Sequence, residues 1–79
     1  MILSNNIYGH QGPINWLEIS SDDYYLLSGS KEAIVLWEGN SGKVIKKINI
    51  PHSTSSKFLP QNNLCLISTD KGSIILYSL

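Results

Sequence analysis

The sequence predicts an all-β fold built from two similar units that follow each other along the chain. Its apolar residues are mainly Ile, Leu, Val and Tyr, with a single Ala at Ala33, and this mixture favours strands over helices. The apolar residues form short runs separated by turn residues, without a helical period. The runs also recur: a shift of 40 residues carries Ile34 onto Ile74.

The first unit is expected to contain four strands. Each strand is an apolar or alternating run, and clusters of Ser, Asp, Gly and Asn separate the runs as turns. Pro51 ends the fourth run, because Pro lacks the N–H that a strand donates to its neighbour. The expected strands are residues 14–19, 24–27, 34–37 and 44–50.

The second unit repeats this order with three strands, which are residues 58–59, 64–67 and 74–77. A shift of 40 residues superimposes residues 26–28 on 66–68, and residues 34–37 on 74–77. A period of ~40–45 residues with four strands per unit is typical of a β-propeller blade. We therefore predict one region over residues 1–79, with a first blade at 9–50 and a second at 51–79 that lacks its outer strand. Residues 1–8 are expected to form the outer strand of a neighbouring blade.

Short motifs in the first unit resemble those of the WD-repeat family. Gly9-His10 stands at its front and Trp37-Glu38 at its end, similar to the Gly-His and Trp-Asp pairs of that family. The resemblance covers nearly all of residues 7–50 and implies two four-stranded WD-type blades of an incomplete ring. Two departures are visible, because Glu38 replaces the Asp of the pair and residues 30–32 offer no Asp to the usual hydrogen-bonded network.

In the family, a His, a Ser or Thr and the Trp belong to this structural network. The physical reason is that a buried indole N–H needs an acceptor, which a hydroxyl supplies. The resemblance assigns these places to His10, Ser28 and Trp37, with Ser68 and Tyr77 as the counterparts in the second unit.

The resemblance also implies that loops at one end of the blades converge on a partner-binding rim. Trp16 has two interpretations, since it either packs between blades or is an exposed anchor of the kind that dominates interfaces. The candidate rim residues are Gln11, Pro13, Asn15, Trp16, Ser30, Lys31, Asp70 and Lys71.

Several function classes are disfavoured. The chain has six Lys, no Arg and zero net charge, which is unlike a binder of the nucleic-acid backbone. Cys65 has no partner for a disulfide, and neither His lies in a metal-ligand pattern, so we expect no metal and no cofactor.

A triad of His10, Ser28 and Asp22 is conceivable, but the repeat pattern already explains the first two as structural, and we expect no catalysis. With no signal peptide and no spanning run, the expected location is intracellular, either cytoplasmic or nuclear.

The expected function is that of a non-catalytic protein-interaction scaffold within a multiprotein complex. Two alternatives remain: a self-assembled ring that binds a small ligand such as a sugar, and a piece of a WD-repeat subunit in small-subunit ribosome synthesis. The second rests on residues 25–38 and 41–43, which resemble one blade of nucleolar WD-repeat proteins. Because two blades cannot close a ring, the expected partners are other proteins, together with either two or three further copies (a ring of three or four chains) or the remaining blades of a longer chain.

Overall fold

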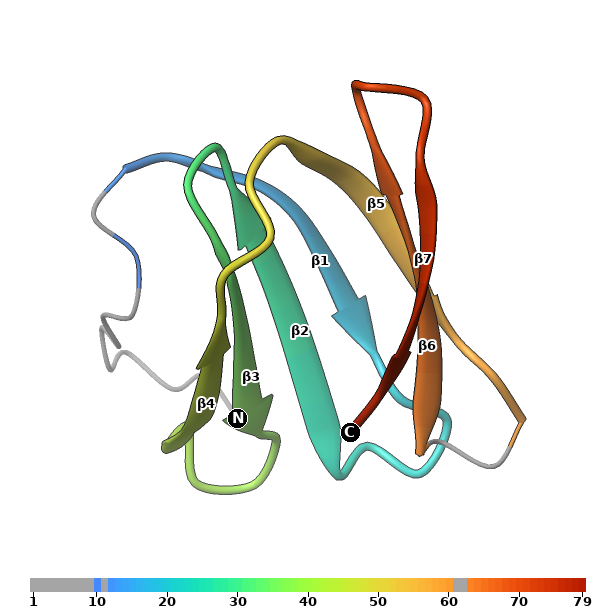
Figure 1. The fold of residues 1–79 in the computed structure, drawn as a ribbon. Helices are drawn as coiled ribbons and strands as arrows, with labels where there is room; N and C mark the ends of the chain where they lie inside the picture. Colours follow the sequence, from blue (N-terminus) through green and yellow to red (C-terminus); the bar gives the residue numbers. More distant parts are fainter. Residues whose placement is uncertain (1–9, 11, 61–62) are drawn as a thin grey trace.

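The computed structural model describes residues 10, 12–60 and 63–79, which form seven strands in two antiparallel sheets and no helix. Figure 1 shows the two sheets side by side. The all-β prediction is confirmed. The strand expected at residues 1–8 lies outside the described residues. The first sheet contains β1 (Ile14–Ile19), β2 (Tyr25–Ser30), β3 (Ile34–Glu38) and β4 (Val44–Ile48), and the second contains β5 (Ser53–Phe58), β6 (Leu64–Thr69) and β7 (Ile74–Ser78).

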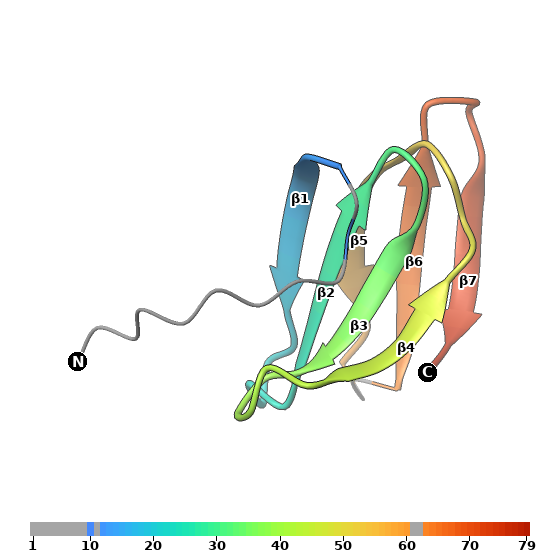
Figure 2. The same cartoon turned by 90° about the vertical axis from the view of Figure 1, so that its left-hand side faces the viewer.

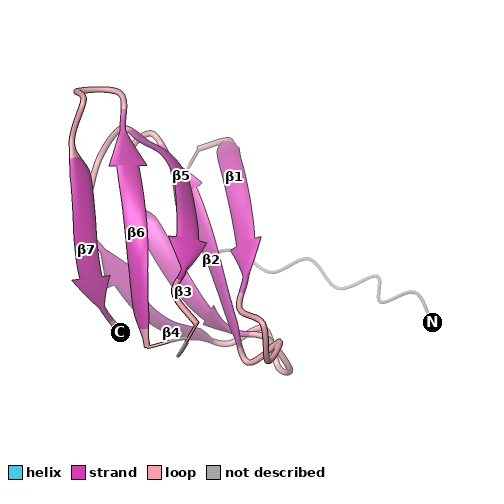
Figure 3. Ribbon diagram, turned by 90° about the vertical axis from the view of Figure 1, so that its right-hand side faces the viewer, coloured by secondary structure: helices cyan, strands magenta, loops and turns pink. Residues whose placement is uncertain are grey.

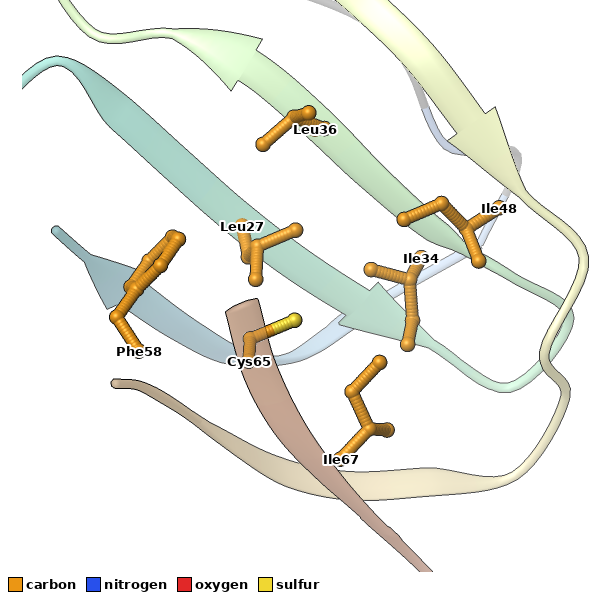
Figure 4. Packing of buried hydrophobic residues seen from close by; sticks show 7 residues of the cluster. All are labelled: Leu27, Ile34, Leu36, Ile48, Phe58, Cys65 and Ile67. Atoms are coloured by element: carbon orange, nitrogen blue, oxygen red, sulfur yellow. The ribbon is translucent and has the colours of Figure 1, made fainter. Parts of the chain in front are cut away.

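In both sheets the strand order follows the chain, so each sheet is a meander of neighbouring hairpins. The sheets pack on each other mainly through β5, which lies against β1 and β2, and the views from either side show this layering (Figures 2 and 3). The core fills the space between the sheets, where strands of both contribute side chains that exclude water. Its buried members are Leu27, Ile34, Leu36, Ile48, Phe58, Cys65 and Ile67 (Figure 4).

The two sheets share one backbone plan. The pairing of β1 with β2 is irregular between Ile14 and Trp16, and the pairing of β5 with β6 is irregular between Ser53 and Ser55. A β-bulge at the same place in both units indicates a true structural repeat, because bulges redirect a strand at a defined position.

The register corrects the expected shift of 40 residues for β6. Leu26 pairs with Trp37, whereas Cys65 and not Leu66 pairs with Tyr77. The first two strands of the units therefore correspond with a shift of 39 residues, and β3 corresponds to β7 with a shift of 40. The cause is the connection before the third strand, which has three residues in the first unit and four in the second. Since a slip of one residue exchanges the two faces of a strand, this difference decides which side chains are buried.

Three strands extend at least two residues beyond the ranges that the sequence predicted. One of them is β6, which continues to Thr69 and does not end at residue 67. The expected turn at residues 28–30 instead continues β2, because the hydroxyl groups of Ser28 and Ser30 find hydrogen-bond partners inside the protein. The expected short strand at residues 58–59 is the end of β5, which begins at Ser53. Because the sequence of β5 is rich in Ser, its apolar pattern does not indicate a strand.

Candidate protein-interaction site

A continuous chain of hydrogen bonds joins His10 to Trp37. The Trp37 Nε1–H donates to the Ser28 hydroxyl at 2.7 Å, and His10 Nε2 lies 2.6 Å from the same oxygen. His10 Nδ1 lies 3.0 Å from the Ser30 hydroxyl, which can donate to the Ala33 carbonyl. One directed arrangement satisfies every atom: Ser28 donates to Nε2, and Nδ1–H donates to Ser30. The structure thus brings together the three residues that the resemblance assigned to the network of the first unit.

This arrangement requires a neutral imidazole. Burial is the main cause that lowers the pKa of His10 below its ordinary value of 6.5, while a hydrogen bond with the Ser28 backbone and the nearby negative charge of Glu32 act in the opposite direction. Ser28 and Trp37 are 0% and 3% exposed, so the network is an internal brace of the first sheet.

The conceivable triad is not assembled. Asp22 lies in the turn between β1 and β2, where its carboxylate accepts hydrogen bonds from the Ser20 hydroxyl at 2.6 Å and the Tyr24 N–H at 2.9 Å. These bonds lower the pKa of Asp22 and serve the turn. The Ser28 hydroxyl, for its part, has no exposed surface from which to attack a substrate.

The expected partnership of Ser68 with Tyr77 is wrong. The counterpart of Ser28 is Ile67, which has no hydroxyl, and Ser68 takes the place of Gly29. The Ser68 hydroxyl lies 2.7 Å from that of Thr54 and 2.8 Å from that of Ser55. Tyr77 instead accepts a hydrogen bond from Lys46 Nζ at 3.3 Å, so its hydroxyl links the second sheet to β4 of the first.

Trp16 lies in the contact between the sheets and does not line the rim. Its side chain packs against the core, and its Nε1–H donates to the Ser53 hydroxyl of β5 at 2.9 Å. Ser53 is itself buried. Of the two interpretations of Trp16, packing between blades matches this position.

The remaining rim candidates converge only in part. An open cleft of about 520 Å³ lies where the two sheets meet at one end, and it gathers side chains from several loops and strand ends. Ser30 is buried in the hydrogen-bond chain, Lys71 is exposed in the turn before β7 outside the cleft lining, and Gln11 lies outside the described residues. The lining consists of four of the candidates, Pro13, Asn15, Lys31 and Asp70, together with His52, Ser53 and Thr54.

His52 joins two turns of the cleft through its backbone, a role that no sequence pattern indicates. Its N–H donates to the Lys31 carbonyl at 2.9 Å, and its carbonyl accepts from the Asp70 N–H at 3.0 Å. It therefore links the corresponding turns of the two units. Its φ of 61° lies in the left-handed region, which is uncommon for a residue with a side chain and is often found at functional positions. The His52 Nδ1 atom also lies 3.7 Å from the Asp70 carboxylate.

The cleft presents charges of both signs within a short span. Lys31 and Asp70 are exposed on opposite units, while Pro13 adds an apolar wall. In the described parts of the chain, no three His, Cys, Asp or Glu side chains gather to hold a metal ion. Among the residues that the structure describes, no helix is long and apolar enough to cross a membrane.

Comparisons with known proteins agree with this architecture. The chain is 29% identical over 73 residues to human WD repeat-containing protein 3 and 31% identical over 71 residues to its Dictyostelium discoideum homolog. These matches cover 92% and 90% of the chain. The chain spans only 8% of the length of either relative. No family model and no solved structure matches the chain.

Three observations agree: two antiparallel meanders with the same bulge, a His–Ser–Trp chain in the first of them, and similarity over most of the sequence to WD-repeat proteins. The chain belongs to the WD-repeat family.

Proposed function

We propose that the protein is a non-catalytic interaction scaffold that binds another protein through the cleft at the end of its two sheets. The observation that carries the proposal is the convergence of Lys31, His52 and Asp70 at this one place. These residues come from three connections, and the backbone of His52 fixes the other two relative to each other. Rigid loops that present varied polar groups are typical of recognition surfaces.

The charges indicate the kind of contact. An exposed ammonium and an exposed carboxylate on opposite walls can each pair with a group of opposite sign on a partner segment. Pro13 offers an apolar surface beside them. An extended peptide segment carrying both charges would satisfy the cleft, and mispairing of like charges would exclude other segments.

The test compares the proteins that co-purify with the wild-type chain and with two cleft variants, Lys31→Glu and Asp70→Lys. Lys43→Glu, in the exposed turn between β3 and β4, is the matched control. We expect some of the co-purifying proteins to be lost from both cleft variants and kept by the control. The binding of these proteins is then measured with purified components. An unchanged set of bound proteins would contradict a role for the cleft.

A small-ligand site is the second candidate, because a cleft of about 520 Å³ with Asn15, Lys31 and Asp70 at its wall has the size and polar groups of a small-molecule site. A panel of sugars should then raise the melting temperature of the wild-type chain and not of Asp70→Lys. The scaffold proposal expects no such rise.

A narrower form of the scaffold proposal assigns it to small-subunit ribosome synthesis inside the nucleus. It is supported by the resemblance of residues 25–38 and 41–43 to blades of nucleolar WD-repeat proteins and by the matches to WD repeat-containing protein 3. Co-sedimentation of the tagged natural protein with pre-ribosomal particles tests this assignment. Sedimentation away from such particles would contradict it, without bearing on the cleft.

A further inference from the structure

Each sheet meets the other with one face, and the opposite face carries exposed apolar side chains. We call the opposite face of the second sheet the second outer face. It carries Leu66, Ile74 and Leu76, which are 37%, 76% and 61% exposed. The opposite face of the first sheet, the first outer face, carries Ile14 and Leu17, which are 49% and 62% exposed. Exposed apolar patches of this kind mark contact surfaces.

The second outer face repeats a face that is already covered within the chain. By the register of the two units, Leu66, Ile74 and Leu76 hold the places of Leu27, Ile34 and Leu36. Those three residues are at most 2% exposed, because the second sheet packs over them. The same aliphatic pattern therefore occurs twice, once buried and once open.

The first outer face repeats the other half of that contact. It contains a hollow of about 210 Å³. Each residue that lines the hollow corresponds, by the register, to a residue of the second sheet that faces the first sheet. The lining is Ile14, Leu17, Leu26, Ser28 and Trp37, and the corresponding residues are Ser53, Ser56, Cys65, Ile67 and Tyr77.

We propose that a second copy of this chain docks head to tail, with its first outer face on the second outer face of this one. Each chain carries both halves of the contact that already joins its own sheets, so a second copy supplies the complementary surface. The zero net charge of the chain imposes no long-range repulsion between copies. A contact between different faces is heterologous, and it closes into a ring when the rotation permits. Propellers have ~4–8 blades, so two-blade chains close with about two to four copies.

The first experiment measures the mass of the 79-residue chain by sedimentation velocity over a range of concentrations. The wild type is expected to form a closed species of about two to four chains. Leu17→Glu and Ile74→Glu should each weaken association by more than about tenfold, because an unpaired charge would be buried in an apolar contact. Asn40→Glu adds the same charge in the exposed turn between β3 and β4 and should leave association unchanged.

A mixing experiment tests the direction of the contact. Leu17→Glu keeps an intact second outer face, and Ile74→Glu keeps an intact first outer face. Each variant alone should stay monomeric. An equimolar mixture should form a dimer, in which the intact first outer face of Ile74→Glu binds the intact second outer face of Leu17→Glu. Both substituted side chains are exposed, and circular dichroism of each variant establishes that it is folded. Association of Leu17→Glu with itself would overturn the head-to-tail contact, since a back-to-back pairing of second outer faces would survive that substitution.

A wild-type chain that stays monomeric at every concentration would overturn the proposal, and would leave other WD-type blades as the cover of both faces. None of these measurements involves a bound partner protein. Failure of self-association is therefore distinct from failure of the proposed cleft function.

Discussion

The indole N–H of Trp16 donates a hydrogen bond to the hydroxyl of Ser53 across the contact between the two sheets, at 2.9 Å. The ring lies directly over Gly29, where an added Cβ would stand 2.0 Å from the Trp16 Nε1 atom. Gly29 thus leaves space for the ring, and the ring reaches the second sheet. One glycine in β2 permits the side chain that joins the two units.

Replacement of Gly29 with Ala should therefore destabilise the protein. The added methyl group overlaps the indole, and overpacking of this kind costs about 1–3 kcal/mol. In a Trp16→Leu background the overlap is relieved, so the same Gly29→Ala change should cost clearly less. Urea unfolding of the four proteins gives both values. Equal costs in the two backgrounds would show that the ring does not need the space at Gly29.

Replacement of Ser28 with Ala should leave the indole N–H of Trp37 without its acceptor in a buried site. Such a loss costs about 1–3 kcal/mol. Ser41→Ala is the matched control, because Ser41 is exposed in a turn and its hydroxyl bonds to Glu38. Unfolding free energies should separate the two variants by at least about 1 kcal/mol. A Ser28→Ala variant as stable as the control would contradict the internal brace.

Replacement of Trp37 with Ala removes a large side chain that is 3% exposed. The expected cost is about 3–5 kcal/mol, which is comparable to the whole stability of a small domain. The variant should be largely unfolded by circular dichroism, whereas Trp37→Phe should remain folded with a smaller loss. A cooperative, wild-type-like melt of Trp37→Ala would contradict the structural role of this buried side chain.

The sequence is sufficient to predict β3, β7 and the buried pair of Ser28 and Trp37. β-branched and aliphatic runs identify the strands, and the family motif identifies the pair. It is not sufficient for β5, because Ser53 to Ser56 resemble a loop until the neighbouring sheet is known to bury Ser53. Secondary structure here follows from tertiary contact and not from local propensity.

The register of β6 could not be settled from the sequence for a different reason. A shift of 40 residues aligns Leu66-Ile67 with Leu26-Leu27, whereas the structure aligns Cys65-Leu66 with that pair. Both alignments match apolar residues with apolar residues, so aliphatic similarity does not distinguish the two faces. The extra residue in the turn before β7 decides the register. His52 was likewise missed, since its role depends on backbone hydrogen bonds to two turns, and backbone contacts leave no pattern in the sequence.

Acidification should weaken the protein through His10. Burial lowers the pKa of His10 in the folded protein below 6.5, so the unfolded chain binds the proton more readily. The stability that neutral His10 contributes is therefore complete above about pH 6.5 and falls as the pH drops through the lowered pKa. Urea unfolding between about pH 8 and 5 should show a steeper loss for the wild type than for His10→Asn. His52 is common to both proteins and cancels in the comparison. Equal slopes would contradict the neutral, partly buried imidazole.

Two blades with the same plan pack through unlike faces, with β5 of the second lying on β1 and β2 of the first. Nuclear Overhauser contacts in the folded chain report on this packing. We expect contacts between the rings of Tyr25 and Phe58, whose centroids lie 6.4 Å apart, between the Trp16 indole N–H and Ser53, and between the backbones of Cys65 and Tyr77. A pattern of contacts that pairs Leu66 and not Cys65 directly opposite Tyr77, or intact sheets without the contacts of Tyr25 and Trp16, would contradict this packing.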